Sequence, residues 1–294
     1  MSWTITPITG RFGAELVGPR LDGTHDGSAL LALLHEYRVI VARDQHLSPS
    51  EQLALARSLG EPTPAHPVVP GHPDHPELLV LDSAAGGRNA RWHTDVTFVA
   101  APPSASVLVS DHVPDHGGDT LWADMRSAYD ALAAPLRALL DGLDAVHRIS
   151  PLAYWGEPFD TALHRDDAAE LFRRSLEVPP VVHPVVRVHP VTGRRNLFVN
   201  PGFTSHVVGL SRIESDGLLD LLHRHATQPE FTLRHRWRAG DVVLWDNRAT
   251  MHYATDDYGD ADRRMRRVTL HGEPPTGANG TVSHIVDDPL LAVR

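Results

Sequence analysis

The chain has 294 residues, of which 41% are hydrophobic and 22% are charged, a composition typical of a globular protein with a full core. Its formal net charge of -10 argues against sequence-independent binding to nucleic acid, which needs a basic face to neutralise phosphates. The absence of cysteine excludes disulfide bonds, thiolate zinc sites and cysteine nucleophiles.

The sequence predicts neither a targeting segment nor a membrane span. Residues 1–7 lack both the basic region and the apolar region of a signal peptide. No apolar run approaches the roughly 20 residues that are needed to cross a bilayer. We therefore expect a cytoplasmic protein without a membrane partner.

The N-terminal part of the chain is predicted to combine short strands with two helices. Apolar residues at helical spacing indicate the first helix, and Ser48-Pro49-Ser50-Glu51 is typical of the start of the second. A loop rich in proline and histidine follows over 61–77. The strands predicted in this part are 3–7, 14–17, 38–42, 78–81 and 92–98, and the helices are 28–37 and a second one that runs into 52–59.

The remaining elements are again mostly short strands. They are separated by proline and glycine turns and do not alternate with helices, which favours an all-β sandwich or barrel with helical inserts over a doubly wound sheet. No repeat, low-complexity segment or linker is found, so one domain over 1–294 is the simplest interpretation. The strands predicted here are 105–110, 181–188, 196–199, 231–237, 241–245 and 267–270, and the helices are 125–143 and 161–176.

With cysteine absent, the 20 histidines are the candidate metal ligands, and the pattern His-x-Asp occurs three times. The pair at His72 lies in the proline-rich loop, where nothing fixes the direction of the side chains. The pair at His164 lies in a predicted helix, where residues two apart point to nearly opposite faces. The remaining pair, His93 and Asp95, lies in a predicted strand and is the better candidate.

Alternation over 92–98 predicts that this strand has an apolar face and a polar face. The apolar face would anchor the strand to the core while the imidazole and the carboxylate project together into a cavity. One face would carry Trp92, Thr94, Val96 and Phe98, and the other His93, Asp95 and Thr97. This arrangement supplies two ligands of a 2-His-1-carboxylate site.

His252 is the best candidate for the third ligand. It follows the buried strand 241–245 and a polar turn, so we expect it at a strand end that faces the same cavity. On its own, His252 could equally be a hydrogen-bonded core histidine.

Two arginines after His252 strengthen the prediction of a site. Arg263 and Arg267 would share one face of a strand and stand roughly 13 Å apart along it. An inward-facing guanidinium is costly to bury unless an anion meets it, and its geometry suits carboxylates and sulfonates. Arg264 and Arg266, on the other face, are predicted to be solvated.

These motifs together resemble the taurine dioxygenase family, whose members are Fe(II)- and 2-oxoglutarate-dependent enzymes acting on sulfonates, sulfate esters and some other small acids. The resemblance runs from about Gly60 to Gly272 and is specific because several motifs coincide. Besides the segment 92–98 and the spacing of His252, Arg263 and Arg267, the motifs are Gly117-Gly118-Asp119-Thr120-Leu121-Trp122, 183–190, 198–203 and Trp245-Asp246-Asn247-Arg248.

The resemblance implies a fold, a cofactor and a quaternary structure. The fold would be an all-β core with helical inserts, a double-stranded β-helix or jelly roll. His93, Asp95 and His252 would bind Fe(II), and 2-oxoglutarate and O₂ would be co-substrates. Relatives are often dimers or tetramers, so a homo-oligomer is expected.

The resemblance also implies roles for further residues. Thr120 and Arg263 would hold the distal carboxylate of 2-oxoglutarate, and Arg267 would lie beside its chelating end and beside the substrate anion. The substrate-pocket positions would be His66, Asn89, the backbone amide of Val96, and Phe203. From the residues alone, His66 could be solvated, Asn89 could cap a turn and Phe203 could belong to the core. Thr120 could bond its own backbone.

The sequence departs from taurine dioxygenase at two places in the expected substrate pocket. Val69 stands where that enzyme has a tyrosine, and Ser150-Pro151-Leu152-Ala153-Tyr154-Trp155 does not follow the expected pocket segment. Both changes make the pocket less polar. A small anionic substrate that is longer or more apolar than taurine is therefore expected, an alkyl sulfonate or a sulfate ester.

The predicted activity is hydroxylation of a substrate carbon, after which a sulfonate or sulfate ester would release sulfite or sulfate and an aldehyde. A hydroxylase or desaturase of an amino-acid-like or aryloxy acid is the main alternative within the family. A halogenase would lack the carboxylate ligand, and Asp95 argues against one. A zinc hydrolase would leave the paired arginines and Thr120 without a role. A non-catalytic jelly-roll binding protein would not consume 2-oxoglutarate.

Overall fold

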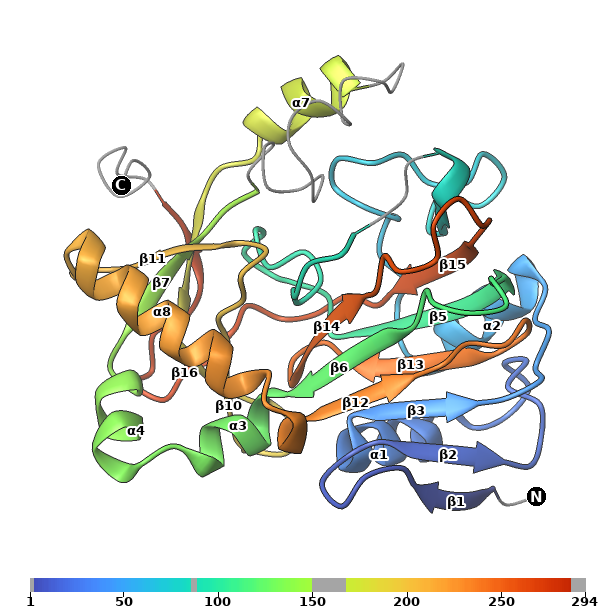
Figure 1. Cartoon of the computed structure of the whole chain (residues 1–294), viewed down its shortest axis with the longest axis horizontal. Coiled ribbons are helices and arrows are strands. Elements are labelled where there is room, and N and C mark those ends of the chain that lie inside the picture. The colour runs from blue at the N-terminus through green and yellow to red at the C-terminus, as the bar shows by residue number, and fades with distance from the viewer. Residues whose placement is uncertain (1–2, 86–88, 150–167, 287–294) are drawn as a thin grey trace.

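The computed structural model describes residues 3–85, 89–149 and 168–286 (Figure 1). The predicted segment 150–155, and the part of the predicted helix that covers 161–167, lie outside these residues. Most of the regular elements in the described part are short strands, as the sequence predicts. The strands are β1 (Thr4–Pro7), β2 (Ala14–Val17), β3 (Val39–Ala42), β4 (Leu79–Asp82), β5 (Ala105–His112), β6 (Thr120–Asp124), β7 (Asp144–His147), β8 (Val181–Pro184), β9 (Val186–Val188), β10 (Arg195–Leu197), β11 (Thr204–Val207), β12 (Thr232–His235), β13 (Val242–Asp246), β14 (Thr250–Ala254), β15 (Arg264–Thr269), β16 (Thr276–Gly277) and β17 (His284–Ile285).

The described helices have clear local signals in the sequence. Ser48 forms a capping box with Glu51 at the start of α2, and Ser211 forms one with Glu214 at the start of α8. The α-helices are α1 (Gly27–Tyr37), α2 (Pro49–Leu59), α3 (Met125–Ala131), α4 (Ala134–Leu140), α7 (Ala168–Leu176) and α8 (Arg212–Ala226). Of the described helices, none combines the length and the apolar character that a membrane span requires.

The largest sheet has seven strands in the order β1-β2-β3-β13-β5-β15-β4. Alternate residues of its strands point to opposite faces, so Ile40 and Leu244 pack under α1 and α2 whereas Val41 and Val243 face the other way. Figure 1 shows α1 and α2 behind this sheet. The helices thus seal its outer face and leave its inner face for a second layer.

The second layer is formed by β12-β6-β14, a three-stranded antiparallel sheet. Trp122 of β6 and Leu233 of β12 pack in one cluster with Trp245 and Met265 of the large sheet. The two sheets therefore enclose a common core, as in the predicted jelly roll, and the all-β core with helical inserts is confirmed. The remaining strands form β11-β7-β8-β17 and β10-β9-β16.

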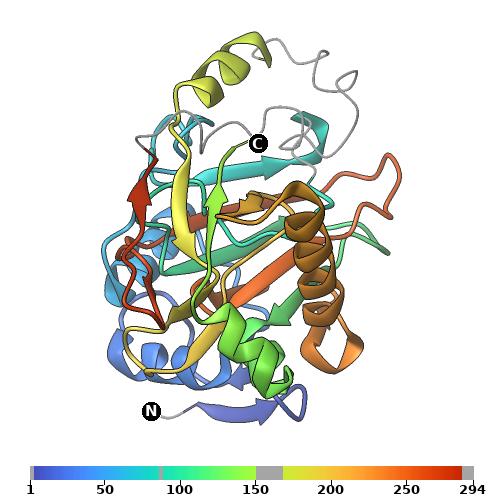
Figure 2. The same cartoon turned by 90° about the vertical axis from the view of Figure 1, so that its left-hand side faces the viewer.

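A helical layer made of α3, α4 and α8 covers the other end of the fold (Figures 1 and 2). Met125 of α3, Leu140 of α4 and Leu222 of α8 share a buried cluster with Val207 of β11. This layer was not predicted in full, because α8 was missed although its capping box at Ser211 is visible in the sequence.

Several predicted boundaries are wrong. The expected helix 125–143 is two helices, because Pro135 sits in the first turn of α4 and the chain before it is extended at Leu132 and Ala133. The expected strand 181–188 is split into β8 and β9. Strands β6, β7, β11, β14, β16 and β17 were also missed.

The predicted strand 92–98 is wrong in a way that matters for the site. Only His93 pairs with another strand, by a single bridge to His252, and the chain then turns. Val96 has a φ of 54°, which takes the backbone out of the extended region. Residues 93 to 98 are all buried, and the chain forms turns after Thr94, so the two predicted faces of a strand do not exist.

Candidate functional site

The three predicted metal ligands meet at one point in the core. One ligating atom from each of His93, Asp95 and His252 lies within 4.8 Å of the others. The Nε2 atoms of His93 and His252 are each 3.8 Å from Oδ1 of Asp95. A first-row metal ion bound at roughly 2.1 Å can link donor atoms up to about 4.2 Å apart, so the spacing suits one ion. The exposed fractions of these residues are 6%, 1% and 6%.

Backbone pairing brings the two imidazoles together. His93 and His252 exchange both main-chain hydrogen bonds, with N···O distances of 2.9 and 2.7 Å. Residues opposite each other in an antiparallel pair share a face, so the two rings lie with centroids 4.1 Å apart. His252 lies inside β14 rather than at a strand end, which corrects the prediction.

The protonation pattern suits metal binding. Nδ1 of His93 is 2.8 Å from the carbonyl oxygen of Arg91, which can only accept, so Nδ1 carries the proton and Nε2 offers its lone pair. Burial lowers the pKa of both His93 and His252, which keeps the imidazoles neutral. Three buried ligating groups of this kind are the donor set of a non-haem iron site.

Asp95 is held as a carboxylate. Burial alone would raise its pKa, but the Arg267 guanidinium, the two imidazoles and a hydrogen bond from Ser106 lower it to about 2. Oγ of Ser106 donates to Oδ2 at 2.9 Å, and Nη1 of Arg267 donates to Oδ1. Arg267 therefore lies directly beside Asp95, one of the three candidate ligands.

Asn247 fixes the backbone of Asp95. Its Oδ1 accepts from the Asp95 amide at 2.9 Å, and its Nδ2 donates to the Asp95 carbonyl at 3.0 Å and to the Pro103 carbonyl at 2.9 Å. Because the chain turns at Val96, the Asp95 backbone has no neighbouring strand to bond, and the Asn247 side chain bonds it instead. In the sequence, Asn247 was recognised only as part of a motif, and neither its role nor that of Ser106 was predicted.

A glycine lets a loop pass directly behind His93. A Cβ atom on Gly202 would stand 2.8 Å from Cβ of His93 and 3.2 Å from Oδ1 of Asn200. Neither neighbour can move freely, because His93 is paired with β14 and Asn200 accepts from the amide of Phe203 at 2.9 Å. The glycine thereby brings Phe203 to the site, with its ring edge-on to His93 at a centroid distance of 6.1 Å.

Arg263 is a buried guanidinium beside the glycine-rich turn. It is 6% exposed, and its Nε donates to the Gly118 carbonyl at 3.0 Å. Among the described residues, no carboxylate forms an ion pair with Arg263, and burial lowers its pKa. A Cβ on Gly118, which has a φ of 66°, would stand 3.0 Å from Cδ of Arg263. The turn is thus shaped around the arginine.

Thr120 follows this turn and starts β6. Its Oγ1 accepts a hydrogen bond from Nε1 of Trp237 at 2.9 Å, so its own proton is available to an acceptor. The turn is held by Asp257, whose Oδ1 accepts from the Gly118 amide at 2.9 Å. Together, Thr120 and Arg263 offer a hydroxyl donor and a cation, which suits a carboxylate.

The predicted solvent exposure of Arg266 is wrong. Arg266 was expected in solvent, but it is 6% exposed and points to the helix side of the large sheet. There Nε donates to Asp111 at 2.8 Å and Nη2 donates to the Leu47 carbonyl at 2.5 Å. The strand alternation was predicted correctly, and the error was to take the second face for solvent. Arg264 is exposed as expected.

The predicted substrate-pocket residues also gather at the site. Asn89 lies with Nδ2 3.4 Å from Nε2 of His93. His66 is buried, its Nδ1 accepts from the amides of Val68 and Val69 at 3.1 Å, and its ring contacts Phe98. Burial, followed by the charge of Arg267, lowers the pKa of His66 to about 3.

An apolar cluster forms a wall around these residues. Its members are Val68, Val96, Phe98, Ile149 and Phe203, with Val69, Val99 and Val178 packed against them. The expectation that Val69 makes the region less polar agrees with this wall. The left-handed backbone of Val96 is costly for a β-branched residue, and such strain is often found at functional sites.

A further cation lies near this wall. Arg174 of α7 is half-buried, and its charge acts on His66. Val178, four residues later, packs into the apolar cluster. Among the described residues, Arg174 has no ion pair, whereas its neighbour Arg173 pairs with Glu170 and Glu177. No pattern in the sequence distinguishes these two arginines.

A second His-His-Asp group, formed by His35, His189 and Asp246, is not built for a metal. Nδ1 of His189 accepts two backbone amides at 3.2 Å, and its Nε2 donates to Asp246 at 2.9 Å. Arg248 donates to both carboxylate oxygens of Asp246, at 3.0 and 3.1 Å. Both ring nitrogens of His189 are thus already used by partners within the protein, which leaves this histidine without a lone pair for a metal ion.

Comparison with known proteins gives consistent matches. The sequence model described as "Taurine catabolism dioxygenase TauD, TfdA family" matches residues 4–269. The chain is 45% identical over 289 residues to an alpha-ketoglutarate-dependent sulfate ester dioxygenase of Pseudomonas putida, covering 95% of this chain and 93% of that one. It is 40% identical over 277 residues to an alkylsulfatase of Acinetobacter baylyi, covering 93% and 86%. A crystal structure of a taurine dioxygenase from Burkholderia xenovorans superimposes with a TM-score of 0.83 at 38% identity, covering 99% and 97%.

Proposed function

Because the chain belongs to the taurine catabolism dioxygenase TauD, TfdA family, we propose that it is an Fe(II)- and 2-oxoglutarate-dependent dioxygenase of alkyl sulfate esters or alkyl sulfonates. One observation carries the proposal: His93, Asp95 and His252 converge in the core of a protein that also buries Arg263 without a carboxylate partner among the described residues. The first group suits a metal ion, and the second suits a dicarboxylate.

The three ligands leave room on the ion. His93, Asp95 and His252 would hold the ion through three donor atoms and would leave coordination positions for a chelating keto acid and O₂. When bound, Fe(II), 2-oxoglutarate and O₂ together supply the oxidation of a C–H bond to C–OH, with 2-oxoglutarate converted to succinate and CO₂. The protein's residues hold and orient these groups and exclude competing reactions.

Thr120 and Arg263 are proposed to bind the distal carboxylate of 2-oxoglutarate. The Thr120 hydroxyl has its proton free to donate, since its oxygen accepts from Trp237. The Arg263 guanidinium is oriented by the Gly118 carbonyl. Arg267 is proposed to lie next to the chelating end, where it also keeps the Asp95 carboxylate ionised.

The substrate is proposed to place its carbon chain against the apolar wall that includes Phe98 and Phe203. Its anionic head would be met by Arg267 and Arg174, and by polar groups of Asn89, of the Val96 amide and of His66. His66 is neutral, because its Nδ1 accepts two amides, so its Nε2 carries a proton to donate. An apolar wall and cations suit an alkyl chain that ends in sulfate or sulfonate.

The products follow from where the oxygen is added. Hydroxylation of R–CH₂–OSO₃⁻ at the carbon next to the ester oxygen gives R–CH(OH)–OSO₃⁻, which collapses to R–CHO and hydrogen sulfate. Hydroxylation of R–CH₂–SO₃⁻ in the same way gives R–CHO and hydrogen sulfite. The matches to a sulfate ester dioxygenase and an alkylsulfatase favour the sulfate ester.

A turnover screen tests the proposal. The chain is supplied with Fe(II), 2-oxoglutarate and O₂ against alkyl sulfates of increasing length, alkyl sulfonates and aryloxy carboxylic acids, and succinate, sulfate and sulfite are measured. The expected result is sulfate released in equal amount to succinate with alkyl sulfates. Succinate formed only with the carboxylic acids, without sulfate or sulfite, would favour the alternative hydroxylase or desaturase.

A further inference from the structure

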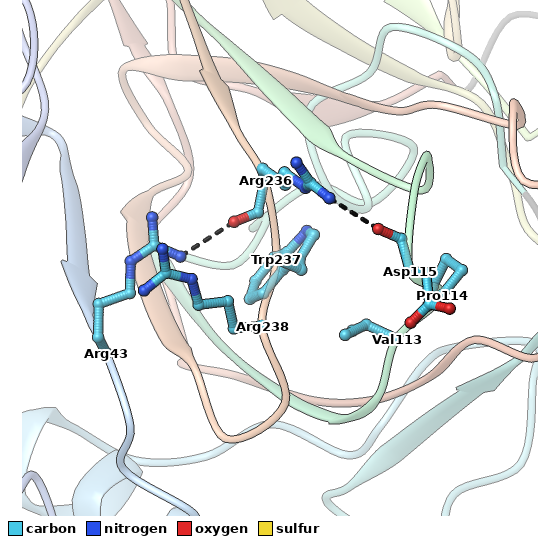
Figure 3. A pocket seen from close by; sticks show the side chains of 7 residues that line it. All are labelled: Arg43, Val113, Pro114, Asp115, Arg236, Trp237 and Arg238. Carbon is cyan, nitrogen blue, oxygen red and sulfur yellow. Dashed lines mark hydrogen bonds between the residues drawn. The ribbon is translucent and has the colours of Figure 1, made fainter.

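A second cavity, outside the metal site, is lined by three arginines. It has a volume of about 470 Å³ and is bounded by Arg43 after β3, by Val113, Pro114 and Asp115 after β5, and by Arg236, Trp237 and Arg238 after β12. Figure 3 shows the indole of Trp237 in the middle of this lining, with Arg43 and Arg238 on one side and 113–115 on the other. None of the lining residues is one of the predicted ligands.

The charges of this cavity are only partly balanced. Arg43 is paired with the buried carboxylate of Asp241 at 2.6 Å. Arg236 donates to the main-chain carbonyl of Asp115 at 2.7 Å, and a carbonyl does not neutralise a charge. The Arg238 side chain has no ion pair with any residue in the part of the chain that the structure describes. Arg236 and Arg238 are thus exposed arginines without a carboxylate partner among the described residues, and one carboxylate, that of Asp115, also lines the cavity.

This arrangement is unusual for the chain as a whole. The protein carries a formal net charge of -10, yet three of its arginines surround one cavity. Like charges that share a concave surface repel one another, and an anion bound between them removes that cost. Guanidinium groups bind sulfate, phosphate and carboxylate oxygens through paired hydrogen bonds.

The cavity shares a wall with the proposed co-substrate site. The Trp237 indole is 5% exposed, and its Nε1 donates to Oγ1 of Thr120 at 2.9 Å. The strands are coupled as well, since His235 of β12 is the register partner of Thr120 of β6. A ligand that contacts Trp237 from the cavity therefore acts on the residue that orients the Thr120 hydroxyl.

We propose that the cavity lined by Arg43, Arg236, Arg238 and Trp237 is a second anion site that binds a small doubly charged oxyanion. Its occupation changes the affinity of the protein for 2-oxoglutarate through the Trp237–Thr120 hydrogen bond. The effect on 2-oxoglutarate affinity rests on the proposed function, whereas the anion site itself does not. By linkage, 2-oxoglutarate changes the affinity for the oxyanion by the same factor.

Calorimetric titration of the full chain without iron tests the anion site. Sodium sulfate, inorganic phosphate and sodium succinate are titrated separately at constant ionic strength, so that tetrahedral and dicarboxylate ligands are distinguished. The double variant Arg236→Ala/Arg238→Ala is compared with Arg212→Ala/Arg224→Ala, which removes the same charge from exposed positions on α8. The expected result is saturable binding of at least one oxyanion, weakened about tenfold or more only in the cavity variant.

Equal affinity in the wild-type chain and both variants, or no saturable binding of any oxyanion, would overturn the site and leave an adventitious ion only. The coupling is then measured as the KM for 2-oxoglutarate with and without the bound oxyanion. A shift is expected in the wild-type chain and not in Trp237→Phe, which lacks the indole donor. Binding without a shift in the wild-type chain would overturn the coupling. Absence of all 2-oxoglutarate turnover would instead count against the proposed function, and the calorimetric result would stand.

Discussion

His93 and His252 are 159 positions apart in sequence and exchange both of their backbone hydrogen bonds. This pairing places two neutral imidazoles on one face, next to the Asp95 carboxylate. The geometry of the site therefore depends on main-chain pairing more than on side-chain packing, and the residues that hold the backbone become testable.

Replacing Asn247 by alanine removes the two hydrogen bonds that hold the amide and carbonyl of Asp95. We expect the metal affinity to fall about 10- to 100-fold, because groups that orient a ligand have effects of this size. Fe(II) titration of the folded variant measures this change. A variant that unfolds at the same denaturant concentration as the wild type and binds iron equally well would contradict the role of Asn247.

Replacing Arg263 by alanine removes the cation proposed for the distal carboxylate of 2-oxoglutarate. We expect the KM for 2-oxoglutarate to rise by roughly 10- to 150-fold, since a hydrogen bond to a charged group contributes about 1.5–3 kcal/mol. The KM for the alkyl sulfate should change little. Arg267→Ala should raise both constants, because Arg267 is proposed to lie beside the chelating end of 2-oxoglutarate and to meet the anionic head of the substrate. If Arg263→Ala and Arg267→Ala changed the KM for 2-oxoglutarate and the KM for the alkyl sulfate equally, the assignment of Arg263 to the distal carboxylate would be contradicted.

Arg174 and Arg173 form a matched pair on α7. Arg174→Ala should raise the KM for an alkyl sulfate several-fold without changing the KM for 2-oxoglutarate. Arg173→Ala, which removes the surface ion pairs with Glu170 and Glu177, should change neither constant. Steady-state assays of both co-substrates measure these constants. An equal response of the two variants would remove Arg174 from the proposed substrate site.

The stability of the chain without metal should fall in acid. His183 is buried and neutral, with its nitrogens bonded to Ser283 and to the Thr97 carbonyl, and burial lowers its pKa to about 3. Its pKa in the unfolded chain is about 6.5, so below that pH the unfolded state binds the extra proton and stability is lost as the pH falls. From pH 7 to pH 5 this group contributes a loss of about 2 kcal/mol.

Urea unfolding at the two pH values measures this loss. His183→Gln puts a side-chain amide in the place of the imidazole, and an amide does not titrate. Between pH 7 and pH 5, the free energy of unfolding of this variant should therefore fall by about 2 kcal/mol less than that of the wild type. An unchanged pH dependence in His183→Gln would show that His183 does not carry this part of the acid sensitivity.

The residues of the candidate site could be named from the sequence more readily than the elements that hold them. His-x-Asp, a distant histidine and two later arginines are patterns that the chemistry of a metal site restricts. The strand expected over 92–98 was wrong. The segment is held by hydrogen bonds to Asn247 and to the Thr250 carbonyl, which lie about 150 residues away in the sequence. Such contacts leave no periodicity in the sequence.

Burial was harder to predict than the strand itself. The alternation over 263–269 was visible, but α2 covers the second face of the sheet, so Arg266 pairs with Asp111 instead of meeting solvent. The helix α8 was missed because its central glycine and mixed polar residues weaken the apolar pattern, although the capping box at Ser211 marks its start. That the whole chain is one domain, and that it forms a homo-oligomer, stay predictions.

The most direct test of the account is anaerobic Fe(II) titration of the chain and of two histidine variants. His252→Ala removes a proposed ligand, and His35→Ala alters the other His-His-Asp group, whose remaining members are already bonded to each other and to Arg248. We predict one Fe(II) per chain in the wild type and in His35→Ala, and none bound tightly in His252→Ala. Iron retained by a folded His252→Ala, or lost in His35→Ala, would contradict the assignment of the site.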